Sequence, residues 1–109
     1  MELRIRSTLL AAFLIAGCSN SAPTTTSLSA LSQAQRDFNG RNVIVSGVLR
    51  TFDAPKHYWI ENDSFNRVAL EGAESLSPWV GQTIEVHGTF FYDVETGRRI
   101  EVKAFKPSP

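Results

Sequence analysis

The chain has 109 residues, of which 11 are Lys or Arg and 11 are Asp or Glu, so its formal net charge at pH 7 is zero. This length is enough for one small domain, and the balanced charge gives no general electrostatic attraction to nucleic-acid phosphates. Cys18 is the only cysteine, which excludes an intrachain disulfide.

The first residues have the pattern of an export signal. Arg4 and Arg6 precede the unbroken apolar run from Leu9 to Ala16. A positive start followed by such a run is typical of a signal peptide. The run is too short for a transmembrane helix, which needs about 20 apolar residues. The alternative, a buried core helix or strand, fits poorly with flanking arginines at the extreme N-terminus.

The segment that ends this run, Leu14-Ile15-Ala16-Gly17-Cys18, resembles the lipobox of bacterial lipoproteins. The resemblance implies that residues 1–17 are a signal peptide that is removed, and that Cys18 becomes an N-terminus carrying diacylglyceryl and further acyl chains. Several chains give a lasting membrane anchor, because each buried methylene contributes about 0.8 kcal/mol. By the same resemblance, Ser19 after the cysteine favours the outer membrane, facing the periplasm, in a Gram-negative host.

Residues 19–30 are polar, low in complexity and nearly free of groups to bury. Such a composition is typical of a flexible linker. The sequence therefore predicts that residues 18–30 are the lipidated cysteine and a disordered tether, and that residues 31–109 form the folded domain.

The rest of the chain alternates between a helical and a strand pattern. Apolar residues recur at helical spacing between Leu28 and Phe38, and Asn39-Gly40 supplies a stop, which predicts a short helix packed on the domain. The remainder shows the alternation and the β-branched content of strands. The expected strands are residues 43–52, 57–62, 67–71, 83–92 and 98–105, with a short helical connection at 73–80.

Two stretches of the chain echo each other. Residues 38–47 and 79–88 each contain an aromatic residue, a glycine turn, an apolar-x-Val strand and a second glycine inside that strand. Because glycine weakens a strand interior, a mid-strand glycine indicates a bulge or a sharp bend. Gly47 and Gly88 are therefore the expected points at which two long strands bend to close a small barrel.

The order of three strands, a short helical connection and two further strands, with the paired glycine-containing strands, resembles the OB-fold, a five-stranded partly open barrel. The resemblance covers about residues 38–105 and extends to small exported bacterial proteins built from one OB domain. It implies an all-β fold with one or two short helices, and it concerns architecture, not activity. An SH3-like barrel or an open sandwich is the alternative architecture.

The sequence offers little for catalysis or for cofactor binding. No serine lies in a Gly-x-Ser-x-Gly motif, and the only thiol belongs to the expected lipid anchor. His57 and His87 match no metal-ligand spacing and have no catalytic partner identifiable by spacing. His87 is expected to point outward from its strand. We therefore expect a protein that is not an enzyme and that holds no metal and no cofactor.

If the domain is an OB-fold, its ligand face lies on the second and third strands, between the loops that join strands one and two and strands four and five. Tyr58 and Trp59 point in opposite directions because side chains alternate along a strand, and the sequence leaves open which of them is exposed. Arg98 and Arg99 have the alternative role of keeping a strand start soluble. The candidate ligand-binding residues are Arg50, Lys56, His57, Tyr58, Trp59, Arg67, Tyr92, Arg98 and Arg99.

Removal of residues 1–17 leaves 9 basic and 10 acidic residues, a formal net charge of −1, which disfavours nucleic acid as a partner. The leading hypothesis is a lipid-anchored, non-enzymatic binding module of the bacterial cell envelope whose partner is a protein or a glycan. One alternative is a binder of single-stranded nucleic acid or oligosaccharide that uses Trp59 and the arginines. Another is a purely structural envelope component.

Overall fold

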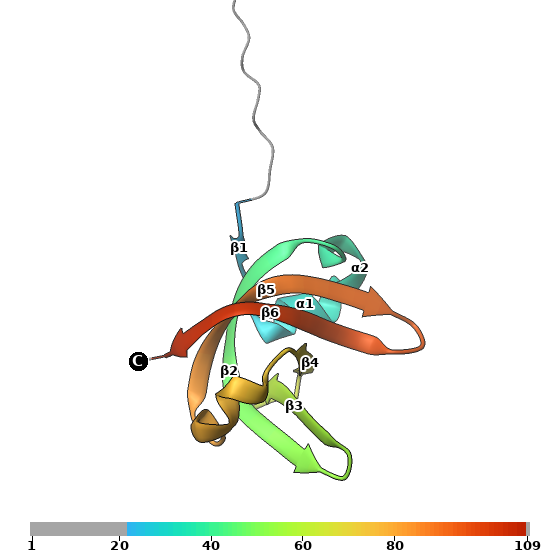
Figure 1. Ribbon diagram of the computed structural model, residues 1–109. Helices are drawn as coiled ribbons and strands as arrows, with labels where there is room; N and C mark the ends of the chain where they lie inside the picture. The colour runs from blue at the N-terminus through green and yellow to red at the C-terminus, as the bar shows by residue number, and fades with distance from the viewer. Residues whose placement is uncertain (1–21, 109) are drawn as a thin grey trace, which may run out of the picture.

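The computed structural model describes residues 22–108 (Figure 1). The expected signal peptide and Cys18 lie outside the described residues. The predicted strands and the helical connection are confirmed to within two residues at each end. The elements are β1 (Thr24–Thr25), α1 (Leu28–Gln33), α2 (Gln35–Phe38), β2 (Asn42–Asp53), β3 (Lys56–Glu61), β4 (Arg67–Glu71), the 3₁₀-helix η2 (Glu74–Trp79), β5 (Thr83–Asp93) and β6 (Gly97–Pro107).

Five of the strands form a closed ring of hydrogen bonds in the order β2-β3-β4-β6-β5-β2. All neighbours in the ring are antiparallel except β4 and β6, which run parallel. Strand β2 closes the ring because its first half, residues 42–48, pairs with β5 while its second half, residues 48–53, pairs with β3. This ring confirms the expected five-stranded OB-type barrel.

The two echoing stretches pair with each other. Strands β2 and β5 are antiparallel, and Val45 lies opposite Val86. These two valines also occupy equivalent positions of the echo, so a local two-fold relation exchanges the two stretches. The sequence showed that the stretches are similar, and the fold shows that they form one symmetric ribbon in the barrel wall.

The turns before these two strands follow the same symmetry. Gly40 N–H donates to Phe90 O at 2.7 Å, and the equivalent Gly81 N–H donates to Leu49 O at 2.8 Å. The φ angles of Gly40 and Gly81 are +83° and +91°. The residue before each glycine has φ and ψ near −57° and +130°, which defines a type II turn. Glycine is required at the third position of such a turn because φ is positive there.

Gly88 marks the predicted bulge. The register between β5 and β6 shifts between His87 and Gly88. A Cβ atom on Gly88 would collide with the Glu101 carbonyl oxygen and lie 2.6 Å from Ile100 Cγ2. The absence of a side chain therefore lets β6 approach β5 closely at the point where the wall bends.

The inside of the barrel is wholly apolar, and no polar side chain is buried among residues 22–108. Side chains of all five strands of the ring point into it, and Phe90 is the largest of the fully buried ones. Burial of each large apolar side chain stabilises the fold by about 1.5–3 kcal/mol. The core consists of Leu28, Leu31, Val43, Val45, Leu49, Tyr58, Ile60, Val68, Leu70, Ala73, Leu76, Ile84, Val86, Phe90 and Ile100.

The expected boundary between tether and domain at residue 30 is wrong, because the fold begins earlier. Strand β1 pairs in parallel with β2, and Ser27 caps α1 by accepting a hydrogen bond from Ala30 N–H at 3.0 Å. Leu28 is only 3% exposed, and its Cδ1 would lie 2.9 Å from a Cβ on Gly47. These contacts could not be predicted from the sequence, because a two-residue strand and one buried leucine leave the composition of residues 19–30 polar. The predicted helix is also divided, at Ala34, into α1 and α2.

Candidate ligand-binding groove

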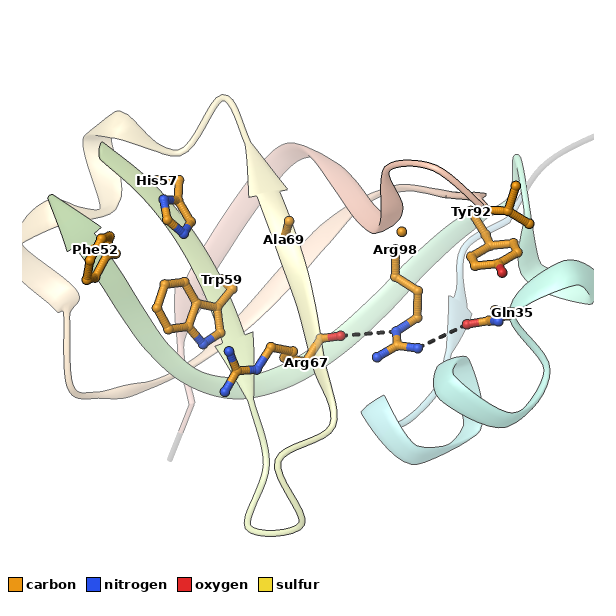
Figure 2. Close-up of a pocket in the computed structure, with 10 residues that line it drawn as sticks. Gln35, Phe52, His57, Trp59, Arg67, Ala69, Tyr92 and Arg98 are labelled. Atoms are coloured by element: carbon orange, nitrogen blue, oxygen red, sulfur yellow. Dashed lines mark hydrogen bonds between the residues drawn. The ribbon is translucent and has the colours of Figure 1, made fainter. Parts of the chain in front are cut away.

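A groove of about 660 Å³ lies over the outer face of β3 and β4 (Figure 2). The end of β2 borders it on one side, the β5–β6 hairpin borders it on the other, and the start of α2 closes one end. This is the face at which the OB resemblance placed the ligand. The lining residues are Gln35, Phe52, His57, Trp59, Arg67, Ala69, Tyr92, Val94, Gly97 and Arg98.

The fold brings five of the nine candidate residues together in this groove. Tyr58 is not among them, because its side chain is 6% exposed and belongs to the core. Trp59 is half-buried and lines the groove, so the structure decides which of the two neighbours is presented outward. The five are His57, Trp59, Arg67, Tyr92 and Arg98.

Three further candidates, Arg50, Lys56 and Arg99, do not line the groove. Each forms an ion pair on the surface of the barrel, with N–O distances of 3.1, 3.0 and 3.3 Å. The partners of Arg50, Lys56 and Arg99 are Glu61, Asp53 and Glu71. Surface ion pairs contribute about 0–1 kcal/mol, so Lys56 and Arg99 have an ordinary surface role, whereas Arg50 acts on the groove through Glu61.

Aromatic rings form a ladder along one wall of the groove. The ring centroids of Phe52 and His57 are 5.8 Å apart, and those of His57 and Trp59 are 5.3 Å apart with an interplanar angle of 29°. The Arg67 guanidinium carbon lies 5.2 Å from the centroid of the Trp59 ring. Figure 2 shows Trp59 between His57 and Arg67. The indole is therefore held by its own neighbours and presents mainly an edge to the groove.

Glu61 fixes the lower end of this ladder. One carboxylate oxygen accepts a hydrogen bond from Trp59 Nε1 at 3.0 Å and lies 3.3 Å from an Arg67 nitrogen. The other accepts a hydrogen bond from Arg50 Nε at 3.1 Å. The bond from Trp59, with those two guanidinium groups, holds the pKa of Glu61 below its ordinary value. The carboxylate therefore stays ionised and keeps Trp59 and Arg67 in place.

Arg98 lies at the point where β4 and β6 diverge and no longer pair. The two strands pair only between residues 69–71 and 99–101. Beyond them Arg98 Nε donates to Arg67 O at 3.1 Å, and Arg98 Nη1 donates to Gln35 Oε1 at 3.0 Å (Figure 2). Both acceptors are neutral. Among residues 22–108, no carboxylate oxygen lies within 4.0 Å of this guanidinium.

The sequence prediction missed Gln35, Ala69, Gly97 and two apolar residues at the rim of the groove. Phe52 is 56% exposed and Val94 is 72% exposed, and each lies at or near a hairpin turn. Alternation offered a signal for Phe52, since Leu49, three positions earlier on the same strand, points into the core. Gln35 had no such signal, because only the tertiary fold brings α2 to Arg98.

The second histidine of the chain, His87, does not line this groove. His87 is half-exposed, as expected, and its Nε2 lies 2.7 Å from Glu85 Oε2. This hydrogen bond lowers the pKa of Glu85. The described part of the chain contains no group of three or more His, Cys, Asp or Glu residues positioned to hold a metal ion. Within residues 22–108, no helix is long and apolar enough to cross a membrane.

Comparisons with known proteins support the fold and nothing finer. No protein-family model matches the chain, and no curated protein matches it. Among solved structures, the chain is similar to a Leishmania major Friedlin protein described as an aspartyl-tRNA synthetase, with a TM-score of 0.54 and 14% sequence identity. The similarity covers 89% of this chain but only 23% of that protein, so it concerns one domain of a much longer chain.

Proposed function

We propose that this protein is a lipid-anchored, non-enzymatic binding module of the bacterial cell envelope, and that its partner binds in the groove over β3 and β4. The groove supports the proposal because it joins, on the ligand face of an OB barrel, an aromatic ladder and a guanidinium that has no carboxylate partner among residues 22–108. Trp, Tyr and Arg are the residues that dominate the binding energy of protein interfaces. All three types line this groove.

The groove is organised before any ligand binds. Glu61 holds Trp59 and Arg67, and Gln35 holds Arg98, through the hydrogen bonds described above. Side chains that are already ordered lose little conformational entropy on binding, so more of the contact energy is available as affinity. This arrangement favours recognition over a purely structural role, which would need no such groove.

The lipid anchor is the second part of the proposal, and it rests on the lipobox-like segment that ends at Cys18. Intact mass spectrometry of membrane-extracted protein tests it. We expect the mass to show the loss of residues 1–17 and a gain from lipid, and we expect Cys18→Ser to abolish the gain. An unmodified full-length mass would remove both the anchor and the envelope from the proposal.

Photo-crosslinking in the native host tests the binding groove. The full chain would carry p-benzoylphenylalanine in place of Phe52 at the groove rim, or, as the matched control, in place of Phe65, which is 72% exposed on the β3–β4 turn. We expect a discrete adduct from position 52 that is absent from position 65 and is lost when Trp59→Ala is added. Equal labelling from both positions, or none from position 52, would contradict a partner in the groove.

A further inference from the structure

We propose that the groove binds an extended protein segment in which a carboxylate side chain and an apolar side chain are several positions apart. This inference rests on the proposed function, because it names the class of partner for the same groove. It follows from three properties of the lining: its charge, the apolar residues at its rim, and the covered faces of its aromatic rings.

The charge of the groove favours a ligand with an anionic group at one position. None of the described residues that line it is Asp or Glu. Arg67 is already paired with Glu61 at 3.3 Å, whereas within residues 22–108 the Arg98 guanidinium donates to two neutral oxygens and to no carboxylate. A guanidinium has five N–H donors, of which Arg98 uses two within the described residues. Its Nη2 is left without a protein acceptor there, so Arg98 is positioned to bind a carboxylate.

The rim of the groove favours a ligand with an apolar group at a second position. Phe52 and Val94 are 56% and 72% exposed, and both border the same groove. At Phe52, which lies at the end of the groove away from Arg98 (Figure 2), an apolar ligand side chain would remove an unfavourable contact with water. A neutral sugar would instead require several free hydrogen-bonding side chains. The only neutral amide in the described lining, Gln35, already accepts a bond from Arg98.

The aromatic rings are poorly placed to stack with the bases of a nucleic acid. Base stacking requires an open ring face. The Trp59 ring lies between His57 and Arg67 (Figure 2), and the Arg36 guanidinium carbon lies 5.5 Å from the Tyr92 centroid. At Trp59 a base would have to displace one of these neighbours, and at Tyr92 the guanidinium already covers one ring face. A protein side chain is smaller than a base and can pack beside these rings as they stand.

The spacing of the two features suits a peptide. Strands β3 and β4 lie between β2 and β6 in the sheet, so Phe52 and Arg98 are about three strand spacings, or ~14 Å, apart across the strands. In an extended peptide, two side chains separated by four to six positions are about 13–20 Å apart. A single short segment can therefore place a carboxylate at Arg98 and an apolar side chain at the Phe52 end.

The test measures binding of defined peptides to the full-length protein in nanodiscs by fluorescence anisotropy. The probes are dye-labelled peptides of about eight residues, long enough to span the groove when extended. Each contains Glu and Phe four, five or six positions apart in a Ser/Ala background. We expect saturable binding of at least one spacing below about 1 mM, weakened about tenfold when its Glu is replaced by Gln, since hydrogen bonds between charged groups are the strong ones.

Two protein variants locate the interaction. Arg98→Gln should weaken binding of the Glu peptide about tenfold and should bind the Glu and Gln peptides equally. The neighbouring Arg99→Gln is the matched control, because Arg99 is paired with Glu71 and does not line the groove. It should leave the affinity unchanged. The comparison of Glu and Gln peptides on the unchanged protein remains decisive even if Arg98→Gln impairs folding.

Single-stranded oligothymidylate and N-acetylchitotetraose serve as competing probes. Tighter binding of either one, lost in Trp59→Ala, would overturn the peptide proposal and leave the proposed binding function intact. Absence of saturable binding by every Glu/Phe peptide would also overturn it, while the crosslink from position 52 would still report on the groove itself. Failure of both experiments would end the proposed function as well.

Discussion

The interior of the barrel and the groove on its outer face are built from alternate residues of the same two strands, β3 and β4, yet they are stabilised in different ways. Inside, Tyr58 and Ile60 are buried among apolar side chains that make no polar contact with one another. Outside, Trp59 and Arg67 are held by ring contacts and by hydrogen bonds or ion pairs to Glu61.

This difference indicates which residues maintain the fold and which are available for binding. Interior side chains stabilise the barrel by removing apolar surface from water. The groove side chains are ordered by contacts that are individually weak because they are partly exposed. We therefore expect substitutions inside to affect mainly stability, and substitutions in the groove to affect mainly binding. Four predictions test this division, beginning with the largest expected effect.

Phe90→Ala should be the most destabilising of these changes. Phe90 is fully buried, and truncation of such a residue leaves a cavity that costs about 3–5 kcal/mol of unfolding free energy. Urea denaturation followed by circular dichroism measures the loss. Phe91→Ala is the matched control, since Phe91 is half-buried on the opposite face of β5. Equal losses for the two variants would refute the assignment of inner and outer faces.

The adjacent residues Tyr58 and Trp59 on β3 test the same division between interior and groove. Tyr58→Ala should lower the unfolding free energy by about 3 kcal/mol, and Trp59→Ala by only about 1 kcal/mol, because the first side chain is buried and the second is half-buried. In contrast, Trp59→Ala should weaken binding to the groove more than Tyr58→Ala does. Crosslinking from position 52 should be lost in Trp59→Ala and retained in any folded fraction of Tyr58→Ala. The same stability loss in both variants would argue against this division.

Gly88→Ala tests whether the bulge depends on close backbone approach. The added methyl group would meet the Glu101 carbonyl and the Ile100 side chain, and overpacking of this kind costs about 1–3 kcal/mol. Thermal unfolding of the full chain measures the change. The neighbouring Thr89→Ala is a suitable control, because the Thr89 side chain is half-buried and its hydroxyl donates a hydrogen bond to Asn42 Oδ1. If Gly88→Ala left the unfolding temperature unchanged, β5 and β6 could move apart at this point without loss of stability.

The smallest expected effect is a dependence of stability on pH. Folding lowers the pKa of Glu61 from its ordinary value of 4.5, so the unfolded chain takes up protons first as the pH falls below that value. Stability is then lost until the folded carboxylate is itself protonated. Glu61→Gln should flatten this acid-side loss in a series of thermal midpoints. Glu85 contributes in the same direction, and the double replacement with Gln should flatten the curve more. An unchanged pH profile in both variants would show that neither carboxylate is coupled to folding.

Much of the fold could be predicted because its signals are local. Alternation identified the five strands of the ring, and the glycine turns before Val43 and Ile84 were visible as an echo. The bulge at Gly88 followed from the weakness of glycine in a strand. Strand β1 was missed because two threonines pair with β2 without any apolar pattern of their own.

The site was predicted less completely, for a physical reason. His57, Trp59 and Arg67 share one face because of strand periodicity, which a sequence can show. Arg98 and Gln35 meet only because β6 runs parallel to β4 and α2 packs where these two strands diverge.

The sequence by itself determined the all-β architecture and the order of the strands along the chain, since these depend on residue alternation and on glycine geometry within short segments. The lipidation of Cys18 stays a prediction from a local motif. Only the tertiary structure decided that Tyr58 is core and Trp59 is groove, that the domain begins before residue 30, and that Arg98 has no carboxylate partner among the described residues. Those outcomes depend on which surfaces close against one another, and ring closure brings together residues that are far apart along the chain.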